Sequence, residues 1–340
     1  MFKVSWKEYN LPFQFPFTIS KGTKTHQPTL IVRLESRGIV GYGEAPAISY
    51  YDITTDKMIA DLQSKKLMVE RYAYTEPERY WHYLHHLFPK NSFLVCALDM
   101  AYCDFYGKSK RMSLSQLWNI DRTDVPLTDY TIGIDSIESM VEKMDKKPWP
   151  IYKVKLGGEK DIEIIEELRK HTEGIIRVDA NAAWTLDEAV SKIDALAAMG
   201  VEFVEQPLAR DDWDGMRVLY QRSKIPVIAD ESCVSEHDVE KCNGYFHGIN
   251  IKLTKCSGPT PARQMIEQAR KLGLKVMIGS MNESSIGSAA IAHLAPLADY
   301  IDCDGPLLLA EDLASGLLYD NGTVTVSSEP GLGVKLFDPF

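Results

Sequence analysis

The chain has 340 residues and a formal net charge of −10 at pH 7, with 45% hydrophobic and 25% charged residues. This length and composition are typical of a globular protein built as one large domain or two of moderate size. The acidic balance argues against a nucleic-acid partner or an anionic membrane surface, because both require a basic face. No apolar run approaches the roughly 20 residues that span a bilayer, so we expect no membrane partner.

The cysteines and the first residues both favour a cytoplasmic location. The six cysteines are scattered along the chain and form no Cys-x-x-Cys pair. Such spacing is typical of reduced, mostly buried thiols. The first nine residues alternate in polarity like a strand and lack the apolar core of a signal peptide.

Residues 1–120 are predicted to form an α+β module. It contains strand and helix patterns at Phe2–Tyr9, Thr29–Glu35, Ile39–Glu44 and Asn91–Tyr106. The segment Asn10–Pro28 holds three prolines and is too long for a tight hairpin turn. We therefore expect a mobile loop there, and we expect loops at about 13–28 and 47–52 to select the ligand.

Residues 121–315 repeat a strand, a loop and a helix. The predicted strands end at Lys155, Asp179, Glu205, Asp230, Lys252, Gly279 and Asp302. Successive ends are 22 to 27 residues apart, and Thr128–Ile132 supplies a first strand. Eight regular βα units predict a (β/α)₈ barrel or a modified one, with an open doubly wound sheet as the alternative. We expect residues 316–340 to return and pack on the N-terminal module.

Three acidic residues stand at equivalent strand ends. Asp179, Glu205 and Asp230 follow one another on neighbouring predicted strands, where such barrels carry their active sites. Three carboxylates form an all-oxygen site suited to a hard divalent cation, most simply Mg²⁺. Each acid alone has another explanation, as a helix N-cap or a surface charge. Asn181 is either a substrate contact or the cap of the helix that begins near Thr185.

Two lysines flank the three acids, at the ends of the strands before and after them. Lys155 and Lys252 so placed would suit removal of a proton next to a carboxylate, with the cation stabilising the resulting enediolate. Lys153 shares a strand face with Lys155, so its charge is expected to lower the pKa of Lys155 toward that of a general base. Lysines that extend to solvent at the barrel rim are the alternative. Lys255 competes with Lys252, but the strand pattern favours Lys252 at the strand end.

These motifs resemble those of the enolase superfamily, in its muconate-lactonizing-enzyme subgroup. The resemblance rests on Lys153-Val-Lys155, Asp179-Ala-Asn181, Glu205-Gln-Pro207, Asp230-Glu-Ser232 and the run from Ile251 to Gly258. It implies an α+β capping domain completed by the C-terminal segment, and a modified TIM barrel of the (β/α)₇β type. It also implies one Mg²⁺ held by the three acids, with Lys155 and Lys252 as acid/base catalysts on opposite faces of the substrate.

The sequence Asp302-Cys-Asp304 separates the reactions of this subgroup. Two carboxylates at positions i and i+2 of an extended segment point to one side and would suit a substrate ammonium group. The pair resembles that of the dipeptide epimerases, which exchange the configuration of the C-terminal residue. A polar turn into Gly305 is the structural alternative. The functional alternatives are an o-succinylbenzoate synthase, a muconate-type cycloisomerase and a non-catalytic barrel. Met281 and Glu283 also resemble this group, and we count both as candidate substrate contacts.

Basic residues in the first long loop predict which side chain the substrate carries. Relatives that act on Ala-Glu typically carry an arginine there, but this chain has no arginine before Arg33. Lys21 and Lys24 lie close to that position and could meet a glutamate carboxylate as point charges. Tyr51 would form a second wall. The resulting hypothesis is a small-molecule dipeptide substrate, L-Ala-D/L-Glu, and a role in peptidoglycan peptide recycling. A dipeptide with apolar or cationic side chains is the alternative. The sequence does not decide whether the protein forms a homo-oligomer.

Overall fold

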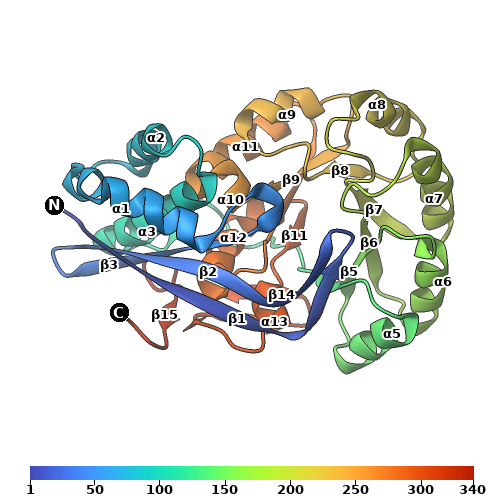
Figure 1. Cartoon of the computed structure of the whole chain (residues 1–340), viewed down its shortest axis with the longest axis horizontal. Coiled ribbons are helices and arrows are strands. Elements are labelled where there is room, and N and C mark those ends of the chain that lie inside the picture. The colour runs from blue at the N-terminus through green and yellow to red at the C-terminus, as the bar shows by residue number, and fades with distance from the viewer.

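An antiparallel sheet with helices on one side forms the N-terminal part of the computed structural model, which describes residues 1–340. The three strands β1 (Lys3–Ile19), β2 (Gly22–Ser36) and β3 (Ile39–Pro46) pair in that order. The helices are α1 (Thr55–Arg71), α2 (Pro77–Leu87) and α3 (Ser92–Lys110), with a 3₁₀ turn η1 (Ser49–Tyr51) before them. We call these elements the cap (Figure 1).

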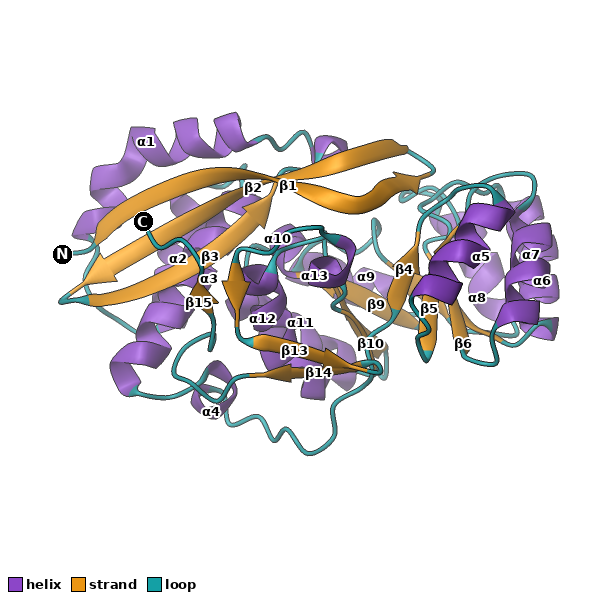
Figure 2. Ribbon diagram, turned by 90° about the horizontal axis from the view of Figure 1, so that it is seen from below, coloured by secondary structure: helices purple, strands orange, loops and turns teal.

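The prediction that Asn10–Pro28 is a loop is wrong, because most of this segment pairs as two strands. Residues 3–36 form one long hairpin whose tip, Ile19–Lys24, extends over the barrel (Figure 2). The prolines suggested a loop because proline has no N–H group to donate to the hydrogen-bond ladder of a sheet. Pro12 and Pro16 fall at the shift of register between Pro12 and Phe17, where the ladder is interrupted in any case. Gly22, with φ of 135°, closes the turn.

Eight parallel strands confirm the barrel, in the sequential order β4 to β11. The strands are β4 (Tyr130–Ile132), β5 (Ile151–Lys155), β6 (Ile175–Asp179), β7 (Val201–Glu205), β8 (Val227–Ala229), β9 (Gly248–Lys252), β10 (Lys275–Gly279) and β11 (Tyr300–Asp302). A parallel bridge between Thr128 and Ile301 links the last strand to the segment before the first. The register pairs Lys155 with Asp179 and Asp179 with Glu205, so these strand ends form one layer.

Helices surround the barrel strands (Figure 1). They are α4 (Leu114–Leu117), α5 (Ile137–Lys146), α6 (Asp161–His171), α7 (Leu186–Ala198), α8 (Trp213–Arg222), α9 (Glu236–Cys242), α10 (Leu253–Cys256), α11 (Pro259–Lys271), α12 (Ser285–Leu294), η2 (Ala295–Leu297) and α13 (Gly305–Leu308). One apolar cluster of 63 buried residues extends through the barrel, and a second of 24 fills the cap. No helix combines the length and the apolar character that a bilayer crossing demands.

The C-terminal segment returns to the cap. After β12 (Ala314–Ser315) it forms the hairpin β13 (Leu317–Asp320) and β14 (Thr323–Val326), then β15 (Lys335–Leu336). Leu332 N donates to Asp104 Oδ1 over 2.8 Å, and Lys7 pairs with Asp338 at 2.6 Å. The cap and the last residues of the chain therefore pack together.

Buried carboxylates of the cap bind the N-termini of barrel helices. Glu44 on β3 accepts hydrogen bonds from Ser284 N and Gly287 N at the start of α12, both at 3.0 Å. Asp99 on α3 accepts from Thr260 N and Oγ1 at the start of α11, both at 2.9 Å. Carboxylates satisfy the free N–H groups of a helix N-terminus and its positive dipole end. These bonds hold the cap in a fixed position on the barrel.

The close approach of β3 to α3 gives a test of the cap. A Cβ atom added at Gly43 would lie 2.0 Å from the backbone oxygen of Ala97, so Gly43→Ala forces two backbones apart. We expect a loss of about 2–3 kcal/mol in the free energy of unfolding, measured with urea. The control Gly158→Ala adds its methyl group to an exposed site with only Asp161 Oδ1 within 4 Å, at 3.9 Å. Equal stability of the two variants would contradict the packing.

Candidate active site

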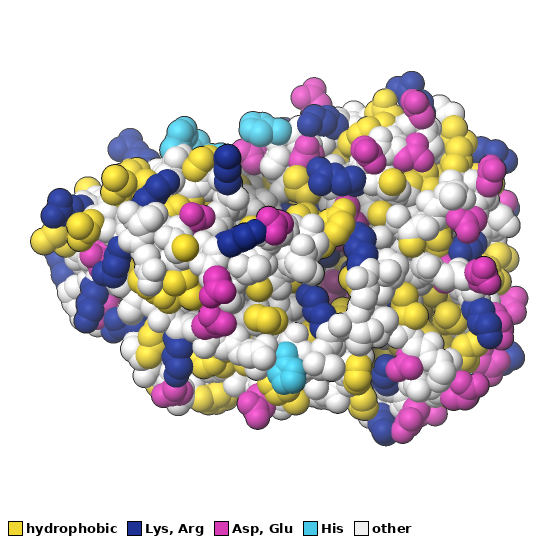
Figure 3. Space-filling model, in the orientation of Figure 1, with side chains coloured by type: hydrophobic (Ala, Val, Ile, Leu, Met, Phe, Trp, Pro, Cys, Tyr) yellow, Lys and Arg dark blue, Asp and Glu magenta, His cyan; other side chains and the backbone are white.

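A pocket opens where the strand ends of the barrel face the cap. Figure 3 shows a hollow at this place, with acidic and basic side chains around it. Its walls come from the cap hairpin, the η1 segment and the loops that follow the strands. The lining residues include Phe17, Ile19, Lys21, Lys24, Ile48, Tyr50, Tyr51, Thr131, Lys155, Asn181, Asp230, Glu231, Lys252, Met281 and Asp302.

The three predicted metal ligands lie together at the ends of β6, β7 and β8. Carboxylate oxygens of Asp179, Glu205 and Asp230 are within 4.8 Å of one another, and all three residues are buried. Burial and the neighbouring Asp179 raise the pKa of Glu205 to about 7. Burial alone would raise the pKa of Asp230 as well, but the ammonium groups of Lys252 and Lys255 hold it well below its usual range. The pKa values of Glu205 and Asp230 are therefore shifted in opposite directions, although both carboxylates belong to one group.

The donor set fits a magnesium ion. All three side chains offer oxygen, the ligand that Mg²⁺ prefers. Glu205 Oε1 accepts from Asn250 Nδ2 at 2.7 Å, whereas Glu205 Oε2 is buried without a hydrogen-bond partner. Lys153 Nζ approaches that oxygen to 2.7 Å, but outside hydrogen-bond geometry. Glu205 Oε2 thus accepts no hydrogen bond, and a bound cation would share this oxygen with Lys153.

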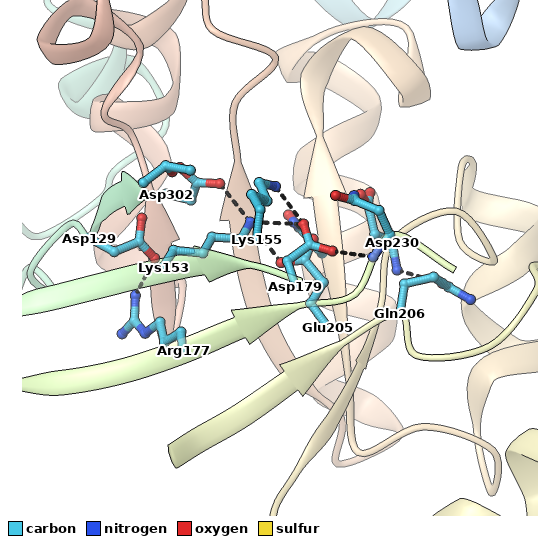
Figure 4. Close-up of polar contacts among 12 residues, drawn as sticks. Asp129, Lys153, Lys155, Arg177, Asp179, Glu205, Gln206, Asp230 and Asp302 are labelled. Carbon is cyan, nitrogen blue, oxygen red and sulfur yellow. Dashed lines mark hydrogen bonds and ion pairs between the residues drawn. The ribbon is translucent and has the colours of Figure 1, made fainter. Parts of the chain in front are cut away.

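Two lysines flank this group of acids, as Figure 4 shows for Lys155. Lys155 Nζ lies 2.6 Å from Asp179 Oδ2, and Lys252 Nζ lies 2.8 Å from Asp230 Oδ2. The three acid-bearing strands separate β5 from β9 in the sheet, so the lysines reach the pocket from two sides. Burial alone would lower the pKa of Lys252, but the carboxylates of Asp230 and Glu205 raise it above its ordinary value.

Lys153 pairs with carboxylates from two other strands. It is fully buried below the pocket, and its Nζ lies 2.7 Å from Glu205 Oε2 and 2.8 Å from Asp302 Oδ2. Although burial favours the neutral form, Asp302 and Glu205 raise the pKa of Lys153 well above its usual value. The sequence showed that Lys153 shares a face with Lys155 but not that carboxylates from β7 and β11 compensate its charge. Lys153 therefore neutralises the buried carboxylates of Glu205 and Asp302.

Lys255 is excluded as a rival of Lys252 by its contacts. Its Nζ donates to Asp230 Oδ1 and to Asp230 O, both at 2.5 Å, and to Cys233 O at 2.9 Å. The residue is buried in α10 and does not line the pocket. It holds Asp230 from behind, whereas Lys252 contacts Asp230 from the pocket side.

The two aspartates after β11 have different surroundings. Asp302 lines the pocket, and its Oδ1 has no hydrogen-bond partner. Asp304 is buried outside the lining, where its Oδ2 accepts from Thr131 N at 2.6 Å. The expectation that both carboxylates face the pocket is wrong for Asp304, because β11 ends at Asp302 and Asp304 stands at the N-cap position of α13, with no capping hydrogen bond from its side chain. Burial and the nearby Asp302 raise the pKa of Asp304 well above its usual value.

Of the other predicted substrate contacts, all but one line the pocket. Asn181, Lys21, Lys24, Tyr51 and Met281 all line the pocket. Glu283 does not, because its carboxylate is buried and accepts from Met281 N at 2.6 Å. Burial and Glu44 raise the pKa of Glu283 to about 8. The Glu283 carboxylate therefore holds the backbone of the loop after β10 instead of facing the pocket.

Sequence reasoning missed three polar residues at the site. Asn250 precedes Lys252 by two positions on β9 and therefore points to the same face, a signal that was present in the sequence. Gln206 has φ of 34°, and its Oε1 accepts from Asp230 N at 3.0 Å. Glu231 lines the pocket beside Asp230. Neither of the latter two roles has a sequence signal, because each depends on a loop conformation.

A second buried acidic group lies beside the pocket. Asp129, Asp302 and Asp304 also bring carboxylate oxygens within 4.8 Å of one another. Here cations already provide compensation: Arg177 Nη1 lies 2.9 Å from Asp129 Oδ2, and Lys153 contacts Asp302 (Figure 4). Only Asp302 of this group reaches the pocket.

Comparison with known proteins identifies the family. Residues 1–118 match the mandelate racemase / muconate lactonizing enzyme N-terminal domain, and residues 135–339 match the enolase C-terminal domain-like family. The chain therefore belongs to the mandelate racemase / muconate lactonizing enzyme family of the enolase superfamily. This confirms the resemblance and the modified barrel with its cap.

Several relatives and solved structures of this family that resemble the chain are dipeptide epimerases. An L-Ala-D/L-amino acid epimerase of Flavobacterium johnsoniae is 48% identical over 98% of this chain and 99% of its own length. The structure of the L-Ala-D/L-Glu epimerase from Bacillus subtilis has a TM-score of 0.93 at 29% identity, covering 98% of both chains. A dipeptide epimerase from Cytophaga hutchinsonii, complexed with Mg and D-Ala-L-Val, has a TM-score of 0.91 at 27% identity, covering 98% and 95%.

Removal of one carboxylate tests the metal site. We expect Glu205→Gln to weaken Mg²⁺ binding by about 100-fold, because it removes a negative oxygen from a three-acid site. Isothermal titration calorimetry with MgCl₂ measures the affinity directly. Glu202→Gln is the matched control, since Glu202 lies on the same strand but pairs with Arg177 outside the pocket. Undiminished affinity in Glu205→Gln would place the metal elsewhere.

Proposed function

We propose that the protein is a Mg²⁺-dependent dipeptide epimerase that inverts the α-carbon of the second residue in dipeptides beginning with L-alanine. The observation that carries the proposal is the placement of Lys155 and Lys252 on two sides of the Asp179–Glu205–Asp230 group in one pocket. The 48% identical relative of Flavobacterium johnsoniae is an epimerase of L-Ala dipeptides, which supports both the reaction and the first residue.

The two lysines supply the proton transfers. Inversion at a carbon requires removal of the α-proton on one face and delivery of a proton on the other. In each direction one lysine must be neutral, to accept the proton, and the other must be an ammonium group, to donate one. Lys155 on β5 and Lys252 on β9 enter the pocket from strands separated by three others. The reverse reaction exchanges their roles.

The acids position the substrate. Asp179, Glu205 and Asp230 would hold Mg²⁺, which when bound stabilises negative charge developing on the substrate carboxylate. Asp302 lies on β11, away from these three strands, and lines the pocket, where its carboxylate would meet the ammonium group of the dipeptide. A substrate without an ammonium group would bring no cation to this acidic side of the pocket. This argues against the cycloisomerase and o-succinylbenzoate synthase alternatives.

The cap selects the side chain of the second residue. Lys24 lines the pocket, and burial lowers its pKa. Its only hydrogen-bond partner is Gln27 Oε1 at 3.4 Å, and it forms no ion pair. A glutamate carboxylate would compensate this cation, while Phe17 and Ile19 in the same wall suit apolar atoms. We therefore propose a range of second residues that includes glutamate, with L-Ala-D/L-Glu as one substrate.

We further propose a cytoplasmic location and a role in recycling peptidoglycan peptides. All six cysteines are buried free thiols, which is typical of a reducing compartment. The recycling role rests on similarity to L-Ala-D/L-Glu epimerases. We also propose a division into a capping domain (1–120), a barrel (121–315) and a segment completing the cap (316–340), supported by the contacts of Leu332 and Asp338 with the cap.

Lysine variants in D₂O test the mechanism. We expect Lys155→Ala and Lys252→Ala each to lose epimerase activity roughly 10³-fold, because each lacks the proton carrier on one face. Residual exchange of the α-proton should occur with a single epimer, opposite in the two variants. A library of L-Ala dipeptides with Mg²⁺, followed by mass spectrometry and chiral analysis, gives both quantities.

Lys160→Ala serves as the control for these variants. Lys160 is exposed on the same side of the barrel and contributes nothing to the pocket. Its variant should retain wild-type activity. Full activity in either active-site variant would remove that lysine from the mechanism, and absence of exchange with every dipeptide in the wild type would overturn the proposed function.

A further inference from the structure

The tip of the cap hairpin is joined to the barrel by an ion pair. Lys21 Nζ lies 2.8 Å from Glu231 Oε1, in the loop after β8. The same Nζ lies 3.7 Å from the centre of the Tyr50 ring, next to η1. No other hydrogen bond or ion pair joins residues 19–24 to the barrel. Three separate segments therefore meet at Lys21, directly over the pocket.

The rest of the hairpin is attached independently of this pair. Ile134 N donates to Thr18 O, and Ala310 N donates to Pro12 O, both at 2.8 Å. Gln14 Nε2 donates to Leu309 O at 3.0 Å. These bonds fix the hairpin up to Thr18. Loss of the Lys21–Glu231 pair would thus alter the pocket wall without detaching the hairpin.

Glu231 brings a negative charge into the substrate pocket. Its side chain is 4% exposed and lines the pocket, and Lys21 is its only ion-pair partner. Glu231 Oε2 is buried without a hydrogen-bond partner. A buried carboxylate that loses its single cation is strongly unfavourable and becomes a site for another cation. Lys21 occupies that place in this structure.

The charges of this wall predict which side chains the pocket admits. Lys21 and Glu231 cancel each other, whereas Lys24 lines the same pocket without a carboxylate within ion-pair distance. The wall is therefore formally positive by one charge when Lys24 is protonated. A basic substrate side chain would meet a like charge, while a neutral or acidic one would not.

We propose that Lys21 and Glu231 are specificity-determining residues: Lys21 masks Glu231 and so excludes dipeptides with a basic second residue. This inference rests on the proposed function for the orientation of the substrate. The catalytic groups and Asp302 take up the backbone of the dipeptide, which leaves the cap wall and Glu231 for the side chain. Without Lys21, the unmasked carboxylate of Glu231 would attract a basic side chain and repel an acidic one.

The test compares L-Ala-L-Lys with L-Ala-L-Met, which have side chains of similar length and different charge. Lys21→Met should raise the affinity ratio of the lysine to the methionine dipeptide roughly tenfold or more, because the unmasked carboxylate gains an ammonium partner. Lys21→Arg should keep the wild-type ratio, since it preserves the charge. Calorimetric binding to the Mg²⁺-loaded protein and exchange in D₂O should report the same change.

The double variant Lys21→Met with Glu231→Gln separates unmasking from a simple loss of positive charge. If Glu231 is the selecting group, the double variant should lose most of the gain. An unchanged ratio in Lys21→Met, or a gain that persists in the double variant, would overturn the proposal. Glu231→Gln alone should raise the ratio of L-Ala-L-Glu to L-Ala-L-Met, and a fall would also contradict it. Binding measurements decide these points even if wild-type protein exchanges no dipeptide, so the two proposals fail separately.

Discussion

Charge compensation among buried groups at the barrel mouth is the constraint on which this structure depends. Four carboxylates, those of Asp179, Glu205, Asp230 and Asp302, face four ammonium groups, those of Lys153, Lys155, Lys252 and Lys255. Their formal charges sum to zero, which permits eight ionisable groups to be buried together. A dication bound to this balanced array would favour loss of a lysine proton. That loss would produce the neutral amine that a general base requires.

The chemistry and the choice of substrate come from different parts of the chain. The barrel supplies proton carriers and acids from rigid strand ends, whereas the cap supplies most of the remaining pocket wall. Glu44 and Asp99 fix the cap by binding the N-termini of α12 and α11. At the hairpin tip, the Lys21–Glu231 pair is the one polar bond to the barrel. Substitutions at the tip can therefore alter specificity while the catalytic array stays intact.

The sequence predicted the barrel and the principal site because both follow from periodicity. Strand ends spaced by 22 to 27 residues place equivalent positions in one layer, and the register between Lys155, Asp179 and Glu205 agrees with this. The alternation of side chains along β5 correctly placed Lys153 and Lys155 on one face.

What the sequence could not predict depends on contacts between distant segments. The partners of Lys153 come from β7 and β11, 52 and 149 positions further along the chain. Asp304 does not face the pocket because α13 begins directly after it. The prolines of the first hairpin suggested a loop, whereas the strand pairing resumes after a change of register. Glu231 gave no signal beyond its place next to Asp230.

The isotopic content of the first product formed tests the central claim most directly. L-Ala-L-Glu or another active L-Ala dipeptide is incubated with the protein and Mg²⁺ in D₂O, and the new epimer is analysed at low conversion. Two lysines on opposite faces predict that the product carries solvent deuterium at the inverted α-carbon from the start, with the alanine α-proton retained. A product that keeps the substrate's own proton would show that a single group moves it across, and would contradict the roles given to Lys155 and Lys252.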